Sequence, residues 1–78
     1  MKIIEINIDQ KSYKIVQIRP TINLYKILHL DGSFEVTRNN YSGTWKILMQ
    51  NNKSAKLPLQ KIGRAIEERL GVGNQQFA

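Results

Sequence analysis

One segment near the C-terminus repeats its apolar residues with the spacing of an α-helix, and the rest of the sequence does not. At 100° per residue its charged positions point away from a single apolar stripe. That stripe consists of Leu59, Ile62, Gly63, Ile66 and Leu70. Pro58 suits a first helical turn and Gly71 a left-handed C-cap, so one amphipathic helix is predicted between them.

The segments that precede this helix alternate apolar and polar residues with the period of a half-buried strand. The first of them alternates Ile4, Ile6 and Ile8 with polar residues. Five such segments are separated by polar or turn-forming breaks near residues 9–11, 19–23, 31–32 and 39–43. We therefore expect an α+β fold, in which an antiparallel sheet of about five strands, a meander of hairpins, is followed by one C-terminal helix packed on one face.

Asp31-Gly32 is the strongest hairpin signal, because glycine adopts a positive φ without a steric clash. Two registers fit the flanking segments. A two-residue turn would pair His29 with Phe34, whereas a three-residue turn that ends at Gly32 would pair Leu28 with Phe34. We expect the second register, because it gathers on one face Leu24, Leu28, Phe34 and Val36.

In that register a second apolar set falls on the opposite face, which one helix cannot cover. The set comprises Tyr13, Ile15, Tyr25, Ile27 and Leu48. The sheet could curl into a half-barrel, pair with a second copy of the chain, or stack nucleic-acid bases on this face. The candidate residues for stacking or for an interface are Tyr13, Tyr25 and Tyr41.

The length of 78 residues favours one domain over residues 1–70, with residues 71–78 as a frayed tail. Cysteine is absent, so neither a disulfide nor a thiolate metal site is possible. No apolar stretch is long enough for a membrane helix and no signal peptide is visible, so we expect a cytoplasmic protein that does not bind membranes.

The inventory of reactive side chains argues against an enzyme. The chain has one histidine, no cysteine and six carboxylates, and no ligand spacing typical of a metal site. His29 lies next to the predicted turn without a grouped catalytic partner. We therefore expect no catalytic residue, no metal, no cofactor and no small-molecule substrate.

Charge is distributed unevenly along the sequence. The formal net charge is +6, and between Glu35 and Glu67 every charged residue is basic. Such segregation indicates contact with phosphate or another polyanion. The candidate residues are Arg38, Lys46, Lys53, Lys56, Lys61 and Arg64.

Two functions of different classes fit these features. The first is a small basic, non-enzymatic module that binds single-stranded nucleic acid or another polyanion through these side chains and through aromatic stacking. In strand order the chain resembles the PUR repeat, a dimeric single-strand binder, although residues 43–70 carry none of that family's diagnostic residues. The second is a homodimeric or adaptor protein whose open face binds protein and whose basic charge is incidental.

Overall fold

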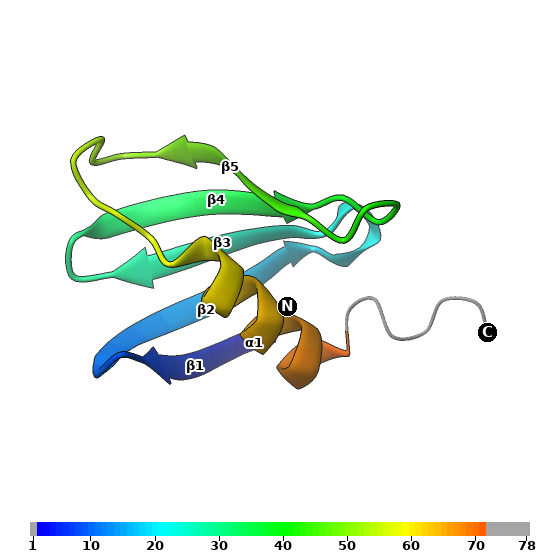
Figure 1. Cartoon of the computed structure of the whole chain (residues 1–78), viewed down its shortest axis with the longest axis horizontal. Coiled ribbons are helices and arrows are strands. Elements are labelled where there is room, and N and C mark those ends of the chain that lie inside the picture. The colour runs from blue at the N-terminus through cyan, green and yellow to red at the C-terminus, as the bar shows by residue number, and fades with distance from the viewer. Residues whose placement is uncertain (1, 72–78) are drawn as a thin grey trace.

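The strands form one antiparallel sheet in which each pairs with the next in the chain, in the order β1-β2-β3-β4-β5 (Figure 1). The computed structural model describes residues 2–71, and the expected α+β fold is confirmed. A 3₁₀ turn over Pro20–Ile22 joins β2 to β3. The elements span β1 Lys2–Ile8, β2 Lys11–Arg19, β3 Leu24–His29, β4 Gly32–Arg38, β5 Trp45–Gln50 and α1 Leu59–Leu70.

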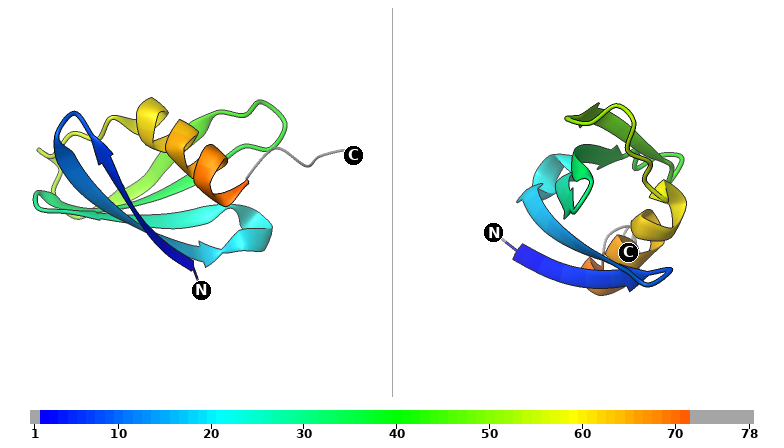
Figure 2. Two further views of the ribbon diagram at one scale, coloured as in Figure 1. Left: turned by 90° about the horizontal axis from the view of Figure 1, so that it is seen from below. Right: turned by 90° about the vertical axis from the view of Figure 1, so that its left-hand side faces the viewer.

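The sheet curls so strongly that α1 fills the gap between its two edge strands (Figure 2). The helix contacts both β1 and β5. The concave face of the sheet and the inner face of α1 enclose one core, made of Ile6, Tyr13, Ile15, Tyr25, Ile27, Phe34, Val36, Trp45, Ile62 and Ile66. Of the three arrangements considered for the second apolar set, the half-barrel is the one observed, and it buries every member of the set except Leu48.

The register predicted for the β3–β4 hairpin is wrong. Phe34 pairs with Ile27 and not with Leu28, and the turn consists of Leu30 and Asp31. This register completes an apolar row across the inner face of the first four strands, which consists of Ile4, Ile15, Ile27 and Phe34. A slip of one residue would turn Ile27 to the solvent, so burial of this row sets the register. Leu28 lies on the outer face instead.

The helix is held on the sheet by one close approach. Gly63 lies in the apolar stripe of α1, and a Cβ atom at this position would come within 2.7 Å of Cγ of Trp45. Gly71 ends the helix with a φ of 70°, which confirms the predicted left-handed C-cap. The remainder of the predicted frayed tail, residues 72–78, lies outside the described residues.

The turn between β1 and β2 holds two non-glycine residues in the left-handed region. Asp9 has a φ of 53° and Gln10 a φ of 67°, and Ile8 pairs with Lys11 across them. Positive φ at both central positions is typical of a type I′ turn, whose twist suits the flanking strands. Because neither residue is glycine, this turn stores backbone strain.

Candidate interaction surface

Two of the six residues predicted to bind a polyanion are paired with carboxylates of the same chain. Nε of Arg38 donates a hydrogen bond to Oε2 of Glu67 at 3.0 Å, and the Arg38 side chain is only 12% exposed. Nζ of Lys61 donates to Oδ2 of Asp9 at 3.0 Å. Both charges are compensated within the fold, which weakens the case for phosphate contacts at these positions.

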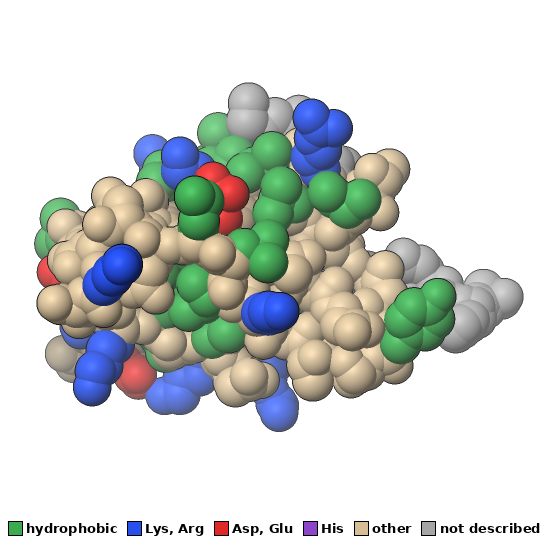
Figure 3. Space-filling view, turned by 90° about the horizontal axis from the view of Figure 1, so that it is seen from above, with side chains coloured by type: hydrophobic (Ala, Val, Ile, Leu, Met, Phe, Trp, Pro, Cys, Tyr) green, Lys and Arg blue, Asp and Glu red, His purple; other side chains and the backbone are tan. Residues whose placement is uncertain are grey.

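The other four basic residues are exposed but lie on different parts of the molecule. Lys46 belongs to β5 and Arg64 to α1. Lys53 and Lys56 belong to the connection between these two elements. Figure 3 looks onto the β5 side, and the lysine and arginine side chains are dispersed around this face. The six predicted residues therefore do not form one continuous basic patch.

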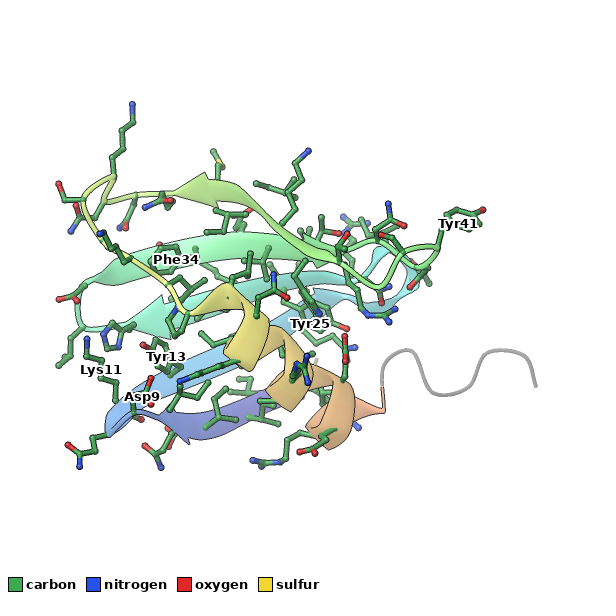
Figure 4. All side chains as sticks on the ribbon, in the orientation of Figure 1. Asp9, Lys11, Tyr13, Tyr25, Phe34 and Tyr41 are labelled. Carbon is green, nitrogen blue, oxygen red and sulfur yellow. The ribbon has the colours of Figure 1, made fainter. Side chains whose placement is uncertain are left out.

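Two of the three candidate stacking residues lie in the core. Tyr13 stacks on the ring of His29 with centroids 4.5 Å apart, and Tyr25 contacts Trp45 at 5.5 Å between centroids. Figure 4 shows both tyrosines between the sheet and the helix, whereas Tyr41 extends from the connection between β4 and β5. Tyr13 and Tyr25 were expected on an open face only because of the wrong hairpin register, and they are too buried to stack on a ligand.

A polar network that the sequence did not predict ties α1 to the sheet. Oε2 of Glu67 accepts hydrogen bonds from Nε1 of Trp45 at 2.9 Å and from Nε of Arg38 at 3.0 Å. Burial alone would raise the pKa of Glu67, but these hydrogen bonds and the charges of Arg38 and Arg64 outweigh it and lower that pKa. The only indication of this network in the sequence was the four-residue spacing of Gly63 and Glu67, which puts both on the same face of the helix.

The hydroxyl of Tyr25 is buried without a hydrogen-bond partner among the described residues. Burial raises its pKa, while the side chain of Gln17 and the charge of Arg38 act in the opposite direction. Gln17 lies directly across from Tyr25 in the sheet. An unpaired buried hydroxyl costs stability.

The ring of His29 is held in place by contacts within the fold. Nδ1 of His29 lies 3.1 Å from the backbone oxygen of Ser12, and Nε2 lies 3.6 Å from Oδ2 of Asp31. Together with the stacking on Tyr13, these contacts fix the ring between β2 and β3. Within residues 2–71 no group of three or more potential metal ligands comes together.

The outer side of β5 is the surface that offers most to a partner. Among the described elements only β4 pairs with β5, so one edge of this strand carries no neighbouring strand. Leu48 and Met49 are 51% and 64% exposed on it. In Figure 3 hydrophobic side chains form a band across the middle of this face, with basic side chains around it. Leu48 was expected to share a face with Tyr13 and Tyr25, but it is exposed whereas they are buried.

The chain has no match among protein-family models, curated proteins or solved structures. Over the described residues, no helix is long and apolar enough to cross a membrane.

A hollow lies beside a bulge of β5, on the side of this strand that faces β4. The ladder between β4 and β5 shifts register between Glu35 and Val36, where Leu48 is the additional residue of a bulge. Next to this bulge lies a hollow of about 190 Å³. It is lined by Lys26, Ser33, Phe34, Glu35, Met49, Gln50 and Asn51. The edge, the two exposed apolar side chains and the hollow together form what we call the β5 surface.

Proposed function

We propose that the protein is a non-enzymatic binding module whose β5 surface pairs with an extended segment of another protein. The single observation that carries the proposal is the unpaired edge of β5 beside the exposed side chains of Leu48 and Met49. An exposed strand edge is a template for an added strand, which gains main-chain hydrogen bonds while flanking side chains supply selectivity.

The backbone of β5 supports this mode of binding. The amide of Asn39 donates to the carbonyl of Thr44, and the amide of Asn51 donates to the carbonyl of Ser33. Hydrogen-bonded pairs alternate along an antiparallel ladder. Counting from these two bonds, the N–H and C=O groups of Ile47 point away from β4, toward the side of β5 where no described strand pairs.

A protein partner is favoured over single-stranded nucleic acid. Binding of a single strand relies on stacking platforms along a continuous basic groove. Here Tyr13 and Tyr25 are buried, and Arg38 and Lys61 are paired with carboxylates. The exposed side chains of β5, Leu48 and Met49, are aliphatic, and exposed apolar groups of this kind are typical of protein contacts.

Another protein is also favoured over a second copy of the chain. Two copies would each bring a formal net charge of +6 to the interface. Like charges on both sides of an interface oppose association, and the effect is largest at low ionic strength. A partner that carries negative charge would instead be attracted electrostatically to this chain.

The experiment is a selection from a display library of random peptides about twelve residues long, enough to span a strand. The full chain is compared with the double variant Leu48→Glu/Met49→Glu and with the control Ile3→Glu, which changes a residue 56% exposed on the outer face of the opposite edge. We expect peptides that bind the wild type and the control but lose at least about tenfold in affinity for the double variant.

Two outcomes would overturn the proposal. One is the absence of any peptide that distinguishes the wild type from Leu48→Glu/Met49→Glu. The other is that labelled oligothymidine binds tightly, with affinity that falls steeply as salt increases, while no peptide is enriched. Light scattering on the same samples reports whether a second copy occupies the surface instead.

A further inference from the structure

The edge of β5 that faces away from β4 presents backbone groups at defined positions. The same alternation that turns the N–H and C=O groups of Ile47 away from β4 does so for Trp45 and Gln50. Leu48, the additional residue of the bulge, follows Ile47 and interrupts this alternation. Regular pairing with an added strand therefore centres on Ile47.

Other parts of the chain contact both ends of β5. At its start, the backbone of α1 packs on the indole of Trp45. At its end, Nε2 of Gln50 donates hydrogen bonds to the carbonyl oxygens of Asn52 and Ala55, at 2.8 and 3.1 Å. Figure 1 shows the connection that leaves this end and returns to α1. The stretch between these contacts, residues 46–49, is therefore the part of the edge left for an added segment.

The two faces of β5 differ along this stretch. Ile47 is half-buried and packs against the core, on the concave face of the sheet. Lys46 is exposed on the opposite face, where it lies across from Thr37 of β4. Successive side chains of a strand point to opposite faces. In an added strand, the residue opposite Ile47 would thus face the core side, and its neighbour opposite Lys46 would face solvent.

Each of these two positions favours a different kind of side chain. Apolar residues that face each other across neighbouring strands stabilise a sheet, so the position opposite Ile47 favours an apolar side chain. Lys46 forms no ion pair with any carboxylate of residues 2–71. A carboxylate opposite Lys46 in an added strand would form a cross-strand pair of opposite charges, whereas a second basic residue there would be repelled.

We infer that β5 binds a segment in which an apolar residue is followed directly by Asp or Glu, the first opposite Ile47 and the second opposite Lys46. This order holds for antiparallel pairing, which continues the meander of the sheet. The inference rests on the proposed function, because it names the sequence that the same edge selects.

The first test exchanges charges between Lys46 and one peptide enriched in the selection, labelled with fluorescein. Lys46→Glu should weaken binding about fivefold, and replacing the acidic residue of the peptide by lysine should restore it. Lys2→Glu makes the same change of charge at an exposed position of the other edge strand and should leave binding of both peptides within about twofold at 0.15 M salt, roughly physiological, where distant charges are screened. Circular dichroism shows whether each variant is folded.

The second test alters only the peptide. Methylation of the backbone nitrogen of its apolar residue removes the hydrogen bond to the carbonyl of Ile47 and should weaken binding about tenfold. The backbone nitrogen of the next residue points away from β5, so methylation there is the matched control and should be tolerated. Replacing the apolar residue by alanine should also weaken binding, by about fivefold.

The two proposals fail in different ways. Peptides that require Leu48 and Met49 but bind Lys46→Glu as well as the wild type would overturn this inference and leave strand addition standing. An acidic residue that couples to Lys46 without directly following the methylation-sensitive residue would also overturn it. A selection that enriches no edge-dependent peptide overturns the proposed function together with the inference.

Discussion

The indole of Trp45 occupies the space that a side chain at Gly63 would need, because a Cβ atom built there would lie 2.7 Å from Cγ of the ring. The absence of a side chain at Gly63 therefore lets the helix backbone pack directly on the indole of Trp45, which belongs to the edge strand β5. Trp45 also donates its indole N–H to Oε2 of Glu67 at 2.9 Å. Glu67 lies one helical turn beyond Gly63 in α1. These contacts hold α1 against the strand that carries the β5 surface.

Gly63→Ala should destabilise the protein by about 2 kcal/mol, although alanine favours a helix over glycine by about 1 kcal/mol. The steric conflict with Trp45 exceeds the gain in helix propensity, since the ring is packed in the core. Urea denaturation measures the change, and Gln60→Ala at an exposed position of α1 is the control. An increase in the free energy of unfolding would contradict the close approach.

Glu67→Gln should make stability less dependent on pH in the acidic range. The pKa of Glu67 is lower in the folded protein than its ordinary value, which model peptides place near 4.3, so the unfolded chain binds this proton more readily. The carboxylate therefore stabilises the fold above the unfolded pKa, and this contribution is lost as pH falls through the folded pKa. Urea denaturation at several values between about pH 3 and 7 shows the slope.

Glu68→Gln is the control for that experiment, because it removes the same charge from an exposed neighbouring position. Glu67→Gln should also lower the free energy of unfolding at neutral pH by about 1 kcal/mol, as expected for a partly exposed charged hydrogen bond. Equal acid sensitivity of Glu67→Gln and wild type would show that the contacts with Arg38 and Trp45 do not form.

Gln10→Gly should stabilise the protein by about 1 kcal/mol. Gln10 has a φ of 67° in the turn between β1 and β2, and glycine adopts such angles without a steric cost. Thermal unfolding measures the change. The control Ser12→Gly lies two residues further on in extended β2, where glycine should instead cost about 0.5 to 1 kcal/mol. Destabilisation by Gln10→Gly would show that the turn has another geometry.

Tyr25→Phe should leave stability unchanged or raise it by up to about 1 kcal/mol, because it removes a buried hydroxyl without a partner among the described residues. The aromatic contact with Trp45 is kept. Tyr13→Phe is the control, since it removes the hydroxyl of a second core tyrosine. A loss of more than about 1 kcal/mol in Tyr25→Phe would mean that the hydroxyl is hydrogen-bonded in solution.

Local periodicity was sufficient to predict the elements of this fold. The helix spans Leu59–Leu70, as its apolar stripe predicted, and the strands fall between the predicted breaks. The register of β3 and β4 was not predictable in this way. The choice between Ile27 and Leu28 as the partner of Phe34 depends on which residues of β1 and β2 face the same side, and a hairpin does not contain that information.

The candidate site was less predictable for the same reason. The wrong register exposed Tyr13 and Tyr25, and the count of basic residues could not reveal that Arg38 pairs with Glu67, 29 positions away. Leu48 is exposed, apart from the buried tyrosines with which the pattern grouped it. The bulge that creates the hollow beside it has no signature in the sequence, because it depends on how β4 and β5 align.

Because α1 bridges the first and the last strand, the order of synthesis constrains how this chain folds. The strands can form hairpins as they leave the ribosome, but the half-barrel remains open until residue 70 has emerged. Until then the inner row of isoleucines and the unpaired edge of β5 are exposed together. Closure by the helix is thus a late event that converts an aggregation-prone ribbon into a half-barrel whose two edge strands are bridged.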